Sequence, residues 1–264
     1  MDDMNKSRIE RAREAFLRGD KSGSSLAHTK EAIEVSVNHI EGHKTNFSLP
    51  EIILGGQDGL VNVLGVILGV AAATNDPRMV AVAGLAATFA ESVSMAAVAY
   101  TSKIARADYY QSEYEREKWE IENEPLGERE EIRSLYRKYG FRGKTLEEIV
   151  RIITGNKDVW LEVMMAQELK LEPVARKEAF RGGVIVGISA LAGSFIPLIP
   201  FFIFSVGNAI WVSLIISTLV LFVVGYYKAK ETLGRQFIKQ GVEMAVIGMM
   251  SALVGYFVGS LFKI

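Results

Sequence analysis

The sequence predicts an all-α, polytopic membrane protein with five transmembrane helices and a charged helical domain between the second and the third. Although 23% of its 264 residues are charged, not one charged side chain occurs in the 46 residues from Gly182 to Tyr227. A soluble domain interrupts its apolar residues with charge at helical or strand spacing, whereas an uncharged run of this length is typical of a bilayer. Acids and bases instead alternate densely through 103–181.

Five apolar segments are expected to span the membrane, and the long uncharged run must supply two of them. As one helix it would be about 69 Å long at 1.5 Å per residue, against a hydrocarbon core of about 30 Å. The run therefore has to fold back once, and Pro197, Pro200 and the Gly207-Asn208 pair mark the turn. The five predicted spans are 52–73, 79–100, 182–204, 209–227 and 244–262.

The distribution of Lys and Arg predicts how these spans are oriented. Eight lie before residue 51, sixteen in 103–181 and four in 228–240, which places 28 of the 30 positive charges on one side of the membrane. Cytosolic connections carry the excess of Lys and Arg in membrane proteins. We therefore expect the N-terminus and 103–181 to be cytosolic and the C-terminus to be outside.

The chain is predicted to divide into four parts. In the charged part, apolar residues recur at spacings of three and four, which is typical of short amphipathic helices, and Gly127, Gly140 and Gly155 are expected to separate these helices. The parts are a cytosolic N-terminal arm (1–48), the first two spans (49–102), the charged domain (103–181) and the last three spans (182–264).

Two smaller expectations concern the arm and the glycines of the spans. The arm is predicted to be partly helical, with a flexible break at 22–25, where the sequence reads Ser-Gly-Ser-Ser. Glycines four residues apart favour close approach of neighbouring helix backbones. Such pairs are Gly65 and Gly69, Gly183 and Gly187, and Gly255 and Gly259.

Several functional classes are excluded or unsupported by what the sequence lacks. Without cysteine there is no disulfide framework, thiolate metal site or cysteine nucleophile. The charged N-terminus does not resemble a cleavable signal peptide, and a net charge of −1 gives no support for nucleic acid as a partner. All three histidines lie in the arm, so the Glu-x-x-His pattern of a di-iron oxidase is missing, as is a phosphate-binding Gly-rich loop. We do not expect an enzyme.

Asp58 and Glu91 are the only acids that lie well inside the predicted spans. A charged group there costs about 2.5 kcal/mol or more, so an intramembrane carboxylate indicates a functional site. The alternatives are a protonated acid bonded across helices or, for Asp58, a side chain that reaches the interface. Met95 follows Glu91 by one helical turn. A thioether beside a carboxylate suits a transition-metal ion better than Mg²⁺ or Ca²⁺, although a lone Met in a span usually serves packing.

The charged domain contains a denser acidic pattern, with nine glutamates in the 19 residues 113–131. Pro125 and Gly127 are expected to break this stretch into two helices. On charge pattern alone, a solvated acidic face is the simpler interpretation. Five of the glutamates are spaced three or four residues apart, which would align them on one face of an unbroken helix: Glu117, Glu120, Glu124, Glu128 and Glu131.

A second cluster changes that interpretation. Met164 and Met165 precede Glu168 by four and three residues on a predicted helix. Adjacent methionines in a charged domain are hard to explain as core alone, and with the glutamate face they would form a mixed oxygen–sulfur site. The charged part is therefore predicted to be a cytosolic helical metal-binding domain between helices 2 and 3.

Several short motifs occur in a specific order from Leu49 to the C-terminus, and together they resemble the vacuolar iron transporter family. The motifs are Gly55-Gly-Gln-Asp-Gly-Leu60, Ser94-Met95 followed by Tyr100, Trp160-Leu with Met164-Met165 and Glu168, Gly193-Ser-Phe-Ile-Pro-Leu-Ile-Pro200, and Gly241-Val-Glu-Met244.

The resemblance implies roles for particular residues. Asp58 and Met95 match the family's pathway aspartate and methionine. A glutamate that some members carry eight residues before the methionine is Ala87 here, and Glu91, one turn away, is expected to replace it. The family also implies a homodimer, with the ion path between subunits near the first spans. The positions that match the family's cytosolic metal ligands are Glu117, Glu120, Glu128, Glu131, Met164, Met165 and Glu168.

These observations predict a transporter that exports Fe²⁺ from the cytosol by proton antiport across the plasma membrane of a prokaryote, with a vacuolar location as the alternative. Metal release and proton uptake are naturally coupled at a carboxylate. No cofactor is expected besides the cargo, with Mn²⁺, Co²⁺ and Zn²⁺ as further ions that the domain would bind. The alternatives are Mn²⁺ as the main cargo, because the two ions share ligand preferences, or a membrane-anchored sensor or buffer without transport.

Overall fold

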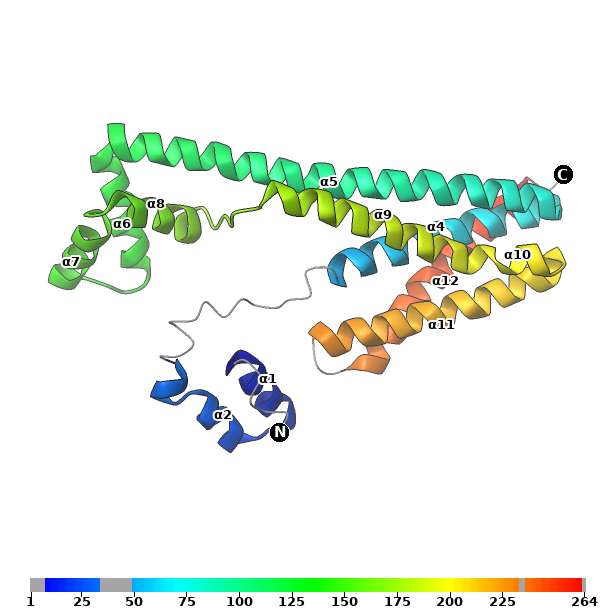
Figure 1. Cartoon of the computed structure of the whole chain (residues 1–264), viewed down its shortest axis with the longest axis horizontal. Coiled ribbons are helices and arrows are strands. Elements are labelled where there is room, and N and C mark those ends of the chain that lie inside the picture. The colour runs from blue at the N-terminus through cyan, green and yellow to red at the C-terminus, as the bar shows by residue number, and fades with distance from the viewer. Residues whose placement is uncertain (1–7, 34–48, 233–235, 263–264) are drawn as a thin grey trace.

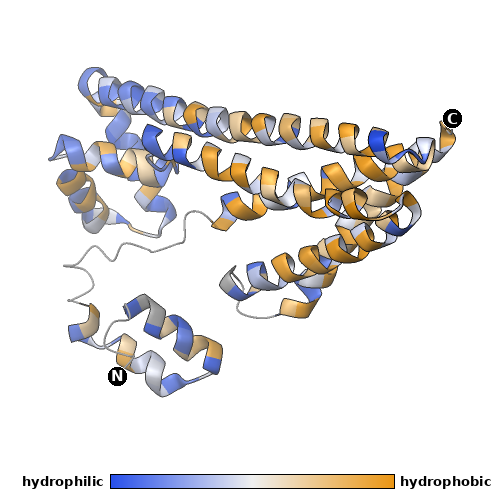
Figure 2. Ribbon diagram, turned by 45° about the vertical axis from the view of Figure 1, so that its right-hand side comes forward, coloured by the Kyte–Doolittle hydropathy of each residue, from blue (hydrophilic) through white to orange (hydrophobic). Residues whose placement is uncertain are grey.

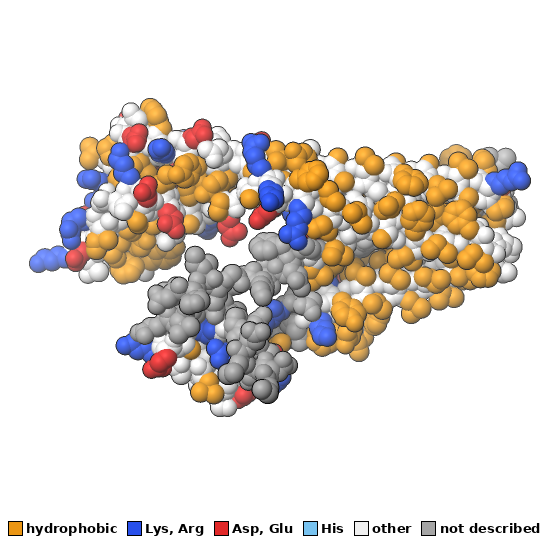
Figure 3. Space-filling model, in the orientation of Figure 1, with side chains coloured by type: hydrophobic (Ala, Val, Ile, Leu, Met, Phe, Trp, Pro, Cys, Tyr) orange, Lys and Arg blue, Asp and Glu red, His pale blue; other side chains and the backbone are white. Residues whose placement is uncertain are grey.

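The structure is a computed structural model that describes residues 8–33, 49–232 and 236–262, and all regular elements in these ranges are helices. Five of the helices are long and apolar enough to cross a membrane, as the sequence predicts, and the face of the bundle seen in Figure 3 is largely apolar. The chain is thus an integral membrane protein. The five spanning helices are α4 (Leu49–Thr74), α5 (Pro77–Asn123), α9 (Arg176–Leu198), α11 (Val206–Thr232) and α12 (Phe237–Leu261).

Helix α4 lies at the centre of the bundle, in contact with α5, α9, α11 and α12. Its side chains Leu64, Ile67 and Leu68 are almost completely buried, and they form one apolar core with Val80 of α5 and Leu198 of α9. Because four helices pack against α4, much of its surface is buried, whereas Asn62 and Val66 remain exposed on the single chain.

Close backbone packing brings α12 against α4 and α9 against α5. A Cβ added to Gly255 or Gly259 of α12 would collide with the backbone of Gly65 or Gly69 of α4. Gly183 and Gly187 of α9 lie close to α5, though less tightly, and a Cβ on Gly187 would come within 2.8 Å of the Cβ of Ala96. The predicted close packing of glycines four residues apart is therefore confirmed.

Helix α5 is the longest element and reaches far beyond the bundle (Figure 1). Asn75 (φ 48°) turns the chain after α4, and Asp76 caps α5 by accepting a 2.8 Å hydrogen bond from the backbone N–H of Arg78. Its 47 residues correspond to about 70 Å, more than twice a hydrocarbon core of about 30 Å. One continuous helix therefore carries residues inside and outside the bilayer.

The uncharged run folds back once, as expected. Helix α9 ends at Leu198, the short α10 (Pro200–Ile203) follows, and α11 begins at Val206. A buried hydrogen bond of 2.8 Å, from the hydroxyl of Ser213 in α11 to the carbonyl of Pro197 in α9, stabilises this turn.

At the end of α5 that leaves the bundle, the chain forms a small helical unit. We refer to residues 103–175 as the distal unit. Its ribbon is largely hydrophilic (Figure 2), and charged side chains are frequent on the face shown in Figure 3. Its core contains Ile121, Ile132, Val150 and Trp160. The helices that follow the end of α5 are α6 (Pro125–Lys138), α7 (Gly143–Ile153), α8 (Lys157–Val163) and the π-helix η1 (Met164–Glu168).

The breaks between these helices agree only in part with expectation. Pro125 begins α6, so the predicted break after the first glutamates is confirmed. Gly140 (φ 98°) lies in the turn after α6 and Gly143 (φ 57°) begins α7, both in left-handed conformations that suit glycine. Gly127, however, lies inside α6 and separates nothing, because Pro125 already provides the break.

The predicted boundaries of the charged domain fall inside helices rather than in linkers. Residues 102 and 103 both belong to α5, and residues 181 and 182 both belong to α9. At the first boundary, Lys103 lies against Gly182 and forms a 2.6 Å ion pair with Glu51 of α4. The distal unit is therefore joined to the spans by continuous helix on one side.

The N-terminal arm contains α1 (Arg8–Arg18) and α2 (Lys21–Ala27). The expected flexible break at 22–25 is wrong, because these residues lie within α2. The Asp20 side chain caps this helix and accepts hydrogen bonds from the N–H and the hydroxyl of Ser22, at 3.0 and 2.6 Å.

Candidate metal centres

Inside the bundle, an amide connects the two intramembrane acids. Asn62 Nδ2 donates to Asp58 Oδ2 at 3.3 Å and to Glu91 Oε1 at 3.1 Å. Asp58 and Asn62 are four residues apart on α4 and so share a face, while Glu91 approaches from α5. Two acids that lie 33 residues apart in sequence therefore meet on one side chain.

We refer to Asp58, Asn62 and Glu91 as the intramembrane triad. Both acids are half-buried and Asn62 is exposed, so the triad opens onto the surface of the single chain. The one neutral amide is their common donor. Such a group of oxygen ligands suits a hard or borderline divalent cation.

Met95 and Ala87 flank this triad along α5. Met95, one turn after Glu91, is half-buried. Ala87, one turn before Glu91, packs against the apolar core formed by α4, α5 and α9. Glu91 is therefore the nearest carboxylate on α5 to the place where the resemblance implies a glutamate, and the roles given to Glu91 and Met95 stay predictions.

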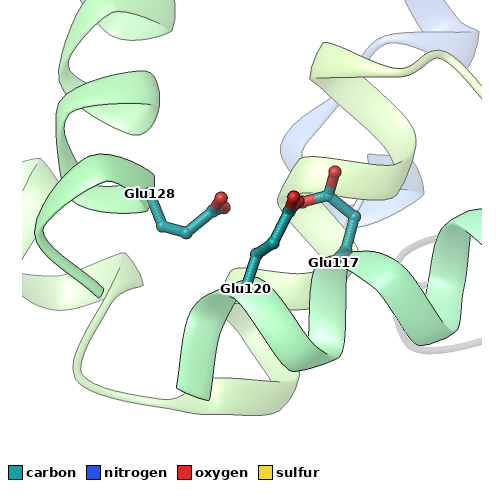
Figure 4. A group of neighbouring side chains, drawn as sticks. All are labelled: Glu117, Glu120 and Glu128. Carbon is teal, nitrogen blue, oxygen red and sulfur yellow. The ribbon is translucent and has the colours of Figure 1, made fainter. Parts of the chain in front are cut away.

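A second acidic group lies in the distal unit, where one carboxylate oxygen of each of Glu117, Glu120 and Glu128 is within 4.8 Å of the others (Figure 4). We call these three residues the distal triad. Glu117 and Glu120 share a face of α5, and Pro125 reverses the chain so that Glu128 of α6 points back at them.

The distal triad is buried to a degree unusual for glutamates. The side chains of Glu117 and Glu128 are 2% and 5% exposed. Glu117 Oε2 and Glu128 Oε2 have no hydrogen-bond partner among the described residues. A buried carboxylate oxygen without a donor is costly, and a bound cation would remove that cost. The donor set therefore fits a divalent metal ion.

The environment of the distal triad raises the pKa of two of its carboxyls, those of Glu117 and Glu128, and of the neighbouring Glu168. Burial, followed by repulsion from Glu117, Glu131 and other glutamates, raises the pKa of Glu128 to about 8. Burial also raises the pKa of Glu117, although Arg116 opposes the shift. Burial and the negative charge of Glu131 raise the pKa of Glu168 to about 7. Clustered carboxyls with raised pKa values are a recognised sign of a binding site.

The other predicted ligands lie at two different depths. Glu131 and Glu168 keep contact with solvent and interact with each other beside the distal triad, where the neighbouring side chains desolvate Glu168 only in part. Met164 and Met165 are 0% and 2% exposed and belong to the apolar core of the distal unit. They lie on a π-helical turn rather than on the predicted α-helix. Their part in binding metal stays a prediction.

Sequence reasoning assigned no role to two residues that contact these acids. Asn62 was visible as a polar residue four positions after Asp58. Arg116 lies three residues after Glu113 and four before Glu120, which is the spacing of ion pairs on a helix. In the structure Arg116 forms both of these ion pairs and a third with Glu117.

Comparison with known proteins agrees with this architecture. The model of the VIT family matches residues 49–260. The chain is 30% identical to the "Vacuolar iron transporter" of Plasmodium berghei (strain Anka), over 98% of each chain. It is 31% identical to "Vacuolar iron transporter 1" of Oryza sativa subsp. japonica, over 90% of this chain and 94% of that protein. "Vacuolar iron transporter 1" of Arabidopsis thaliana is 29% identical, over 83% and 88% of the two chains.

Proposed function

The chain belongs to the VIT family, and on this premise we propose that it is a carrier, not an enzyme, that moves divalent metal ions, chiefly Fe²⁺, out of the cytosol. The observation that carries the proposal is the intramembrane triad. Two carboxylates from neighbouring spans converge on one amide where charge is expensive. A protein that only senses or buffers metal gains nothing from acids at that depth.

In the proposed path, the distal unit collects the ion and the intramembrane triad passes it on. The glutamates of the distal triad, with Glu131 and Glu168, bind Fe²⁺ from the cytosol, and Met164 and Met165 are its sulfur ligands. The ion then reaches Asp58, Glu91 and Met95. Helix α5 supports a path with two separate stations, because it carries both Glu91 and Glu117 and places them 26 residues, or about 39 Å, apart.

Proton antiport is the proposed coupling. When the ion leaves Asp58 and Glu91, their negative charges lose their counter-ion in a region of low dielectric. Protons from the opposite side would neutralise them, since metal release and proton binding compete for the same oxygens. Each transport cycle would then exchange Fe²⁺ for protons.

The proposed topology places the N-terminus and the distal unit in the cytosol and the C-terminus outside, since 28 of 30 positive charges then lie on the cytosolic side. We propose the plasma membrane of a prokaryote as the location. The relatives are named as vacuolar transporters, so a vacuolar membrane is the alternative location.

A homodimer is proposed for a physical reason. Asn62 is exposed on the single chain, and Asp58 and Glu91 are only half-buried. Lipid contact with these polar groups would be costly, and a second copy on this face would remove it and enclose the ion path.

The decisive experiment is flux into proteoliposomes that contain a pH-sensitive dye. With Fe²⁺ under reducing conditions outside, we expect metal uptake together with a change of the internal pH towards alkaline values in vesicles whose inserted molecules present the distal unit outwards. Faster uptake of Mn²⁺ at equal concentration would make Mn²⁺ the main cargo. Metal binding without any flux would support the sensor or buffer and would refute transport.

A further inference from the structure

The distal triad already holds a cation that belongs to the chain itself. Arg116 Nη2 donates to Glu117 Oε1 at 2.6 Å, and Arg116 Nη1 forms an ion pair with Glu120 Oε2. Two of the three carboxylates that would bind metal are therefore neutralised in part by one guanidinium. Arginine is always charged, so this cation does not leave by losing a proton.

Arg116 satisfies the triad from one side only. It uses Oε1 of Glu117, whereas Oε2 of Glu117 stays buried without a partner. Glu128, on the opposite side, has no ion pair among the described residues and also keeps a buried oxygen without a partner. A metal ion between the three carboxylates would serve these two orphaned oxygens, but it would also lie next to a like charge.

The guanidinium has a second partner outside the triad. Arg116 Nε and Nη2 both donate to Glu113 Oε2, at 3.0 and 2.8 Å. The Arg116 side chain is 43% exposed and the Glu113 side chain is 19% exposed, so neither is locked in the core. Arg116 can thus release Glu117 and Glu120 and still keep two hydrogen bonds on the surface of α5.

We propose that Arg116 is an internal competitor of the metal ion. Binding of a divalent cation at the distal triad displaces the guanidinium from Glu117 and Glu120 onto Glu113, and its return helps to expel the ion. This inference rests on the proposed function, in which the distal unit loads the ion and must also let it go. Arg116 sets a moderate affinity, and Glu113 holds the arginine while the ion is bound.

The test is the equilibrium binding of Mn²⁺ by the full chain in detergent, followed by the electron paramagnetic resonance signal of free Mn²⁺. The fraction of sites that disappears in a variant with Glu117, Glu120 and Glu128 all changed to Gln defines binding at the distal triad. Arg116→Gln should tighten that binding by about tenfold or more, the size of one charge-assisted hydrogen bond. Circular dichroism confirms that each variant is folded.

Arg133→Gln is the matched control. Arg133 pairs with Glu130 and Glu147, neither of them in the distal triad, so its removal changes the net charge equally without freeing a triad oxygen. Its effect should be small and should vanish in about 1 M salt, where the screening length is about 3 Å. The effect of Arg116→Gln should persist there, because contact pairs are screened less.

Glu113→Gln separates competition from simple electrostatics. With its second partner weakened, Arg116 should remain on Glu117 and Glu120, and metal affinity should fall. In the Arg116→Gln background, the same Glu113→Gln change should have almost no effect, whereas independent charge effects would add. If Arg116→Gln does not fold, Arg116→Met, which keeps the unbranched stem of the side chain and removes its charge, takes its place in both comparisons.

The outcomes are distinct. Weaker or unchanged binding in Arg116→Gln would show that the arginine positions the glutamates and would overturn the inference alone. Additive effects of the two substitutions would overturn it too. If the wild-type chain binds no Mn²⁺ at the distal triad, the loading role in the proposed function fails and the inference fails with it.

Discussion

In the spans, Asp58 and Glu91 share one neutral amide, whereas in the distal unit Glu117 and Glu120 share a guanidinium. Glu128 forms no ion pair within the part of the chain that the structure describes. Both groups use α5 and one neighbouring helix. They differ in the number of carboxylates, in burial and in the charge of the donor. The intramembrane triad has two half-buried carboxylates beside an exposed amide. The distal triad has three carboxylates, two of which are almost completely buried.

The difference follows from the surroundings of each group. Within a bilayer each added carboxylate costs free energy, so a path for ions can hold only as many as the ion needs in passing. Next to water, a small protein core can tolerate a cluster of acids, because arginine and solvent stabilise its rim. We therefore expect the distal triad to govern how much metal is bound and the intramembrane triad to govern whether it crosses.

The largest expected effect is that of Asp58→Asn on transport. Asparagine keeps the size of the side chain and its contact with Asn62 but removes the negative charge and the titratable proton. Flux of Fe²⁺ and the coupled pH change should fall together by about tenfold or more, as expected for the loss of a charged ligand. Thermal unfolding in detergent should be unchanged or slightly improved, because a costly charge is gone.

Asp76→Asn is the control for that experiment. Asp76 caps α5 at the turn after α4, and asparagine is as good a cap. This variant should transport normally. A folded Asp58→Asn protein that still carries Fe²⁺ with a normal pH change would disprove the central role of Asp58, and Glu91 would be the first alternative to examine.

The next effect concerns binding rather than flux. Changing Glu117, Glu120 and Glu128 together to Gln should remove most of the metal bound by the full chain in calorimetry with Co²⁺ or Mn²⁺, since it removes the orphaned carboxylate oxygens. Transport should fall only several-fold at saturating metal, because the intramembrane triad is intact.

Glu115, Glu122 and Glu124 supply a matched control triple, because they are exposed glutamates of the same stretch and lie outside the cluster. The same change to Gln there should leave binding almost intact. Equal losses in the two triple variants would mean that the acidic stretch acts only through its net charge, as a solvated face would.

A smaller effect tests the contrast in packing. Gly255→Ala would push a methyl group into the backbone of Gly65 in the spans, whereas Gly127 of α6 has nothing within 4 Å. The first substitution should lower the free energy of unfolding by about 1–3 kcal/mol, as overpacking does. Gly127→Ala should raise it by about 0.4–1 kcal/mol, because alanine favours a helix. Thermal unfolding in detergent compares them, and equal shifts would contradict the contrast.

Much of this architecture could be predicted from sequence. Uncharged length forces the fold-back between α9 and α11, and a proline at 125 forces the break after α5. Both are local rules of geometry. The continuity of α5 through residue 103 could not be predicted. The change from apolar to charged residues marks where the helix leaves the bilayer for water, but it does not interrupt the backbone hydrogen bonds of the helix.

Among the site residues, too, local contacts could be predicted from the sequence and contacts between helices could not. Spacing alone predicted that Glu117 and Glu120 share a face, and the structure brings Glu128 to them. That Asn62 joins Asp58 to Glu91 depends on how α4 packs against α5, which no local pattern contains. The burial of Met164 and Met165 likewise depends on the π-turn and on the core around it.

The smallest expected effect is a pH dependence of the metal-free distal unit. The pKa of Glu128 is raised to about 8 and that of Glu168 to about 7, above the ordinary value of 4.5. Between those values the folded state binds more protons than the unfolded state, so stability falls as pH rises. The distal unit should therefore be most stable below about pH 5 with respect to these groups, and should lose that stability as pH rises through about 7 to 8.

A chain whose only tryptophan is Trp160, made by Trp119→Phe and Trp211→Phe, would report unfolding of the distal unit by fluorescence. Without metal, its unfolding temperature should be lower at pH 8 than at pH 6. Saturating Mn²⁺ should remove the difference, because a bound cation stabilises the ionised carboxylates. Glu128→Gln should flatten the metal-free pH dependence, whereas Glu115→Gln should not. A distal unit that becomes more stable at pH 8 without metal would show that its buried glutamates are already neutralised by the protein, and the case for a cation site there would lose its strongest physical support.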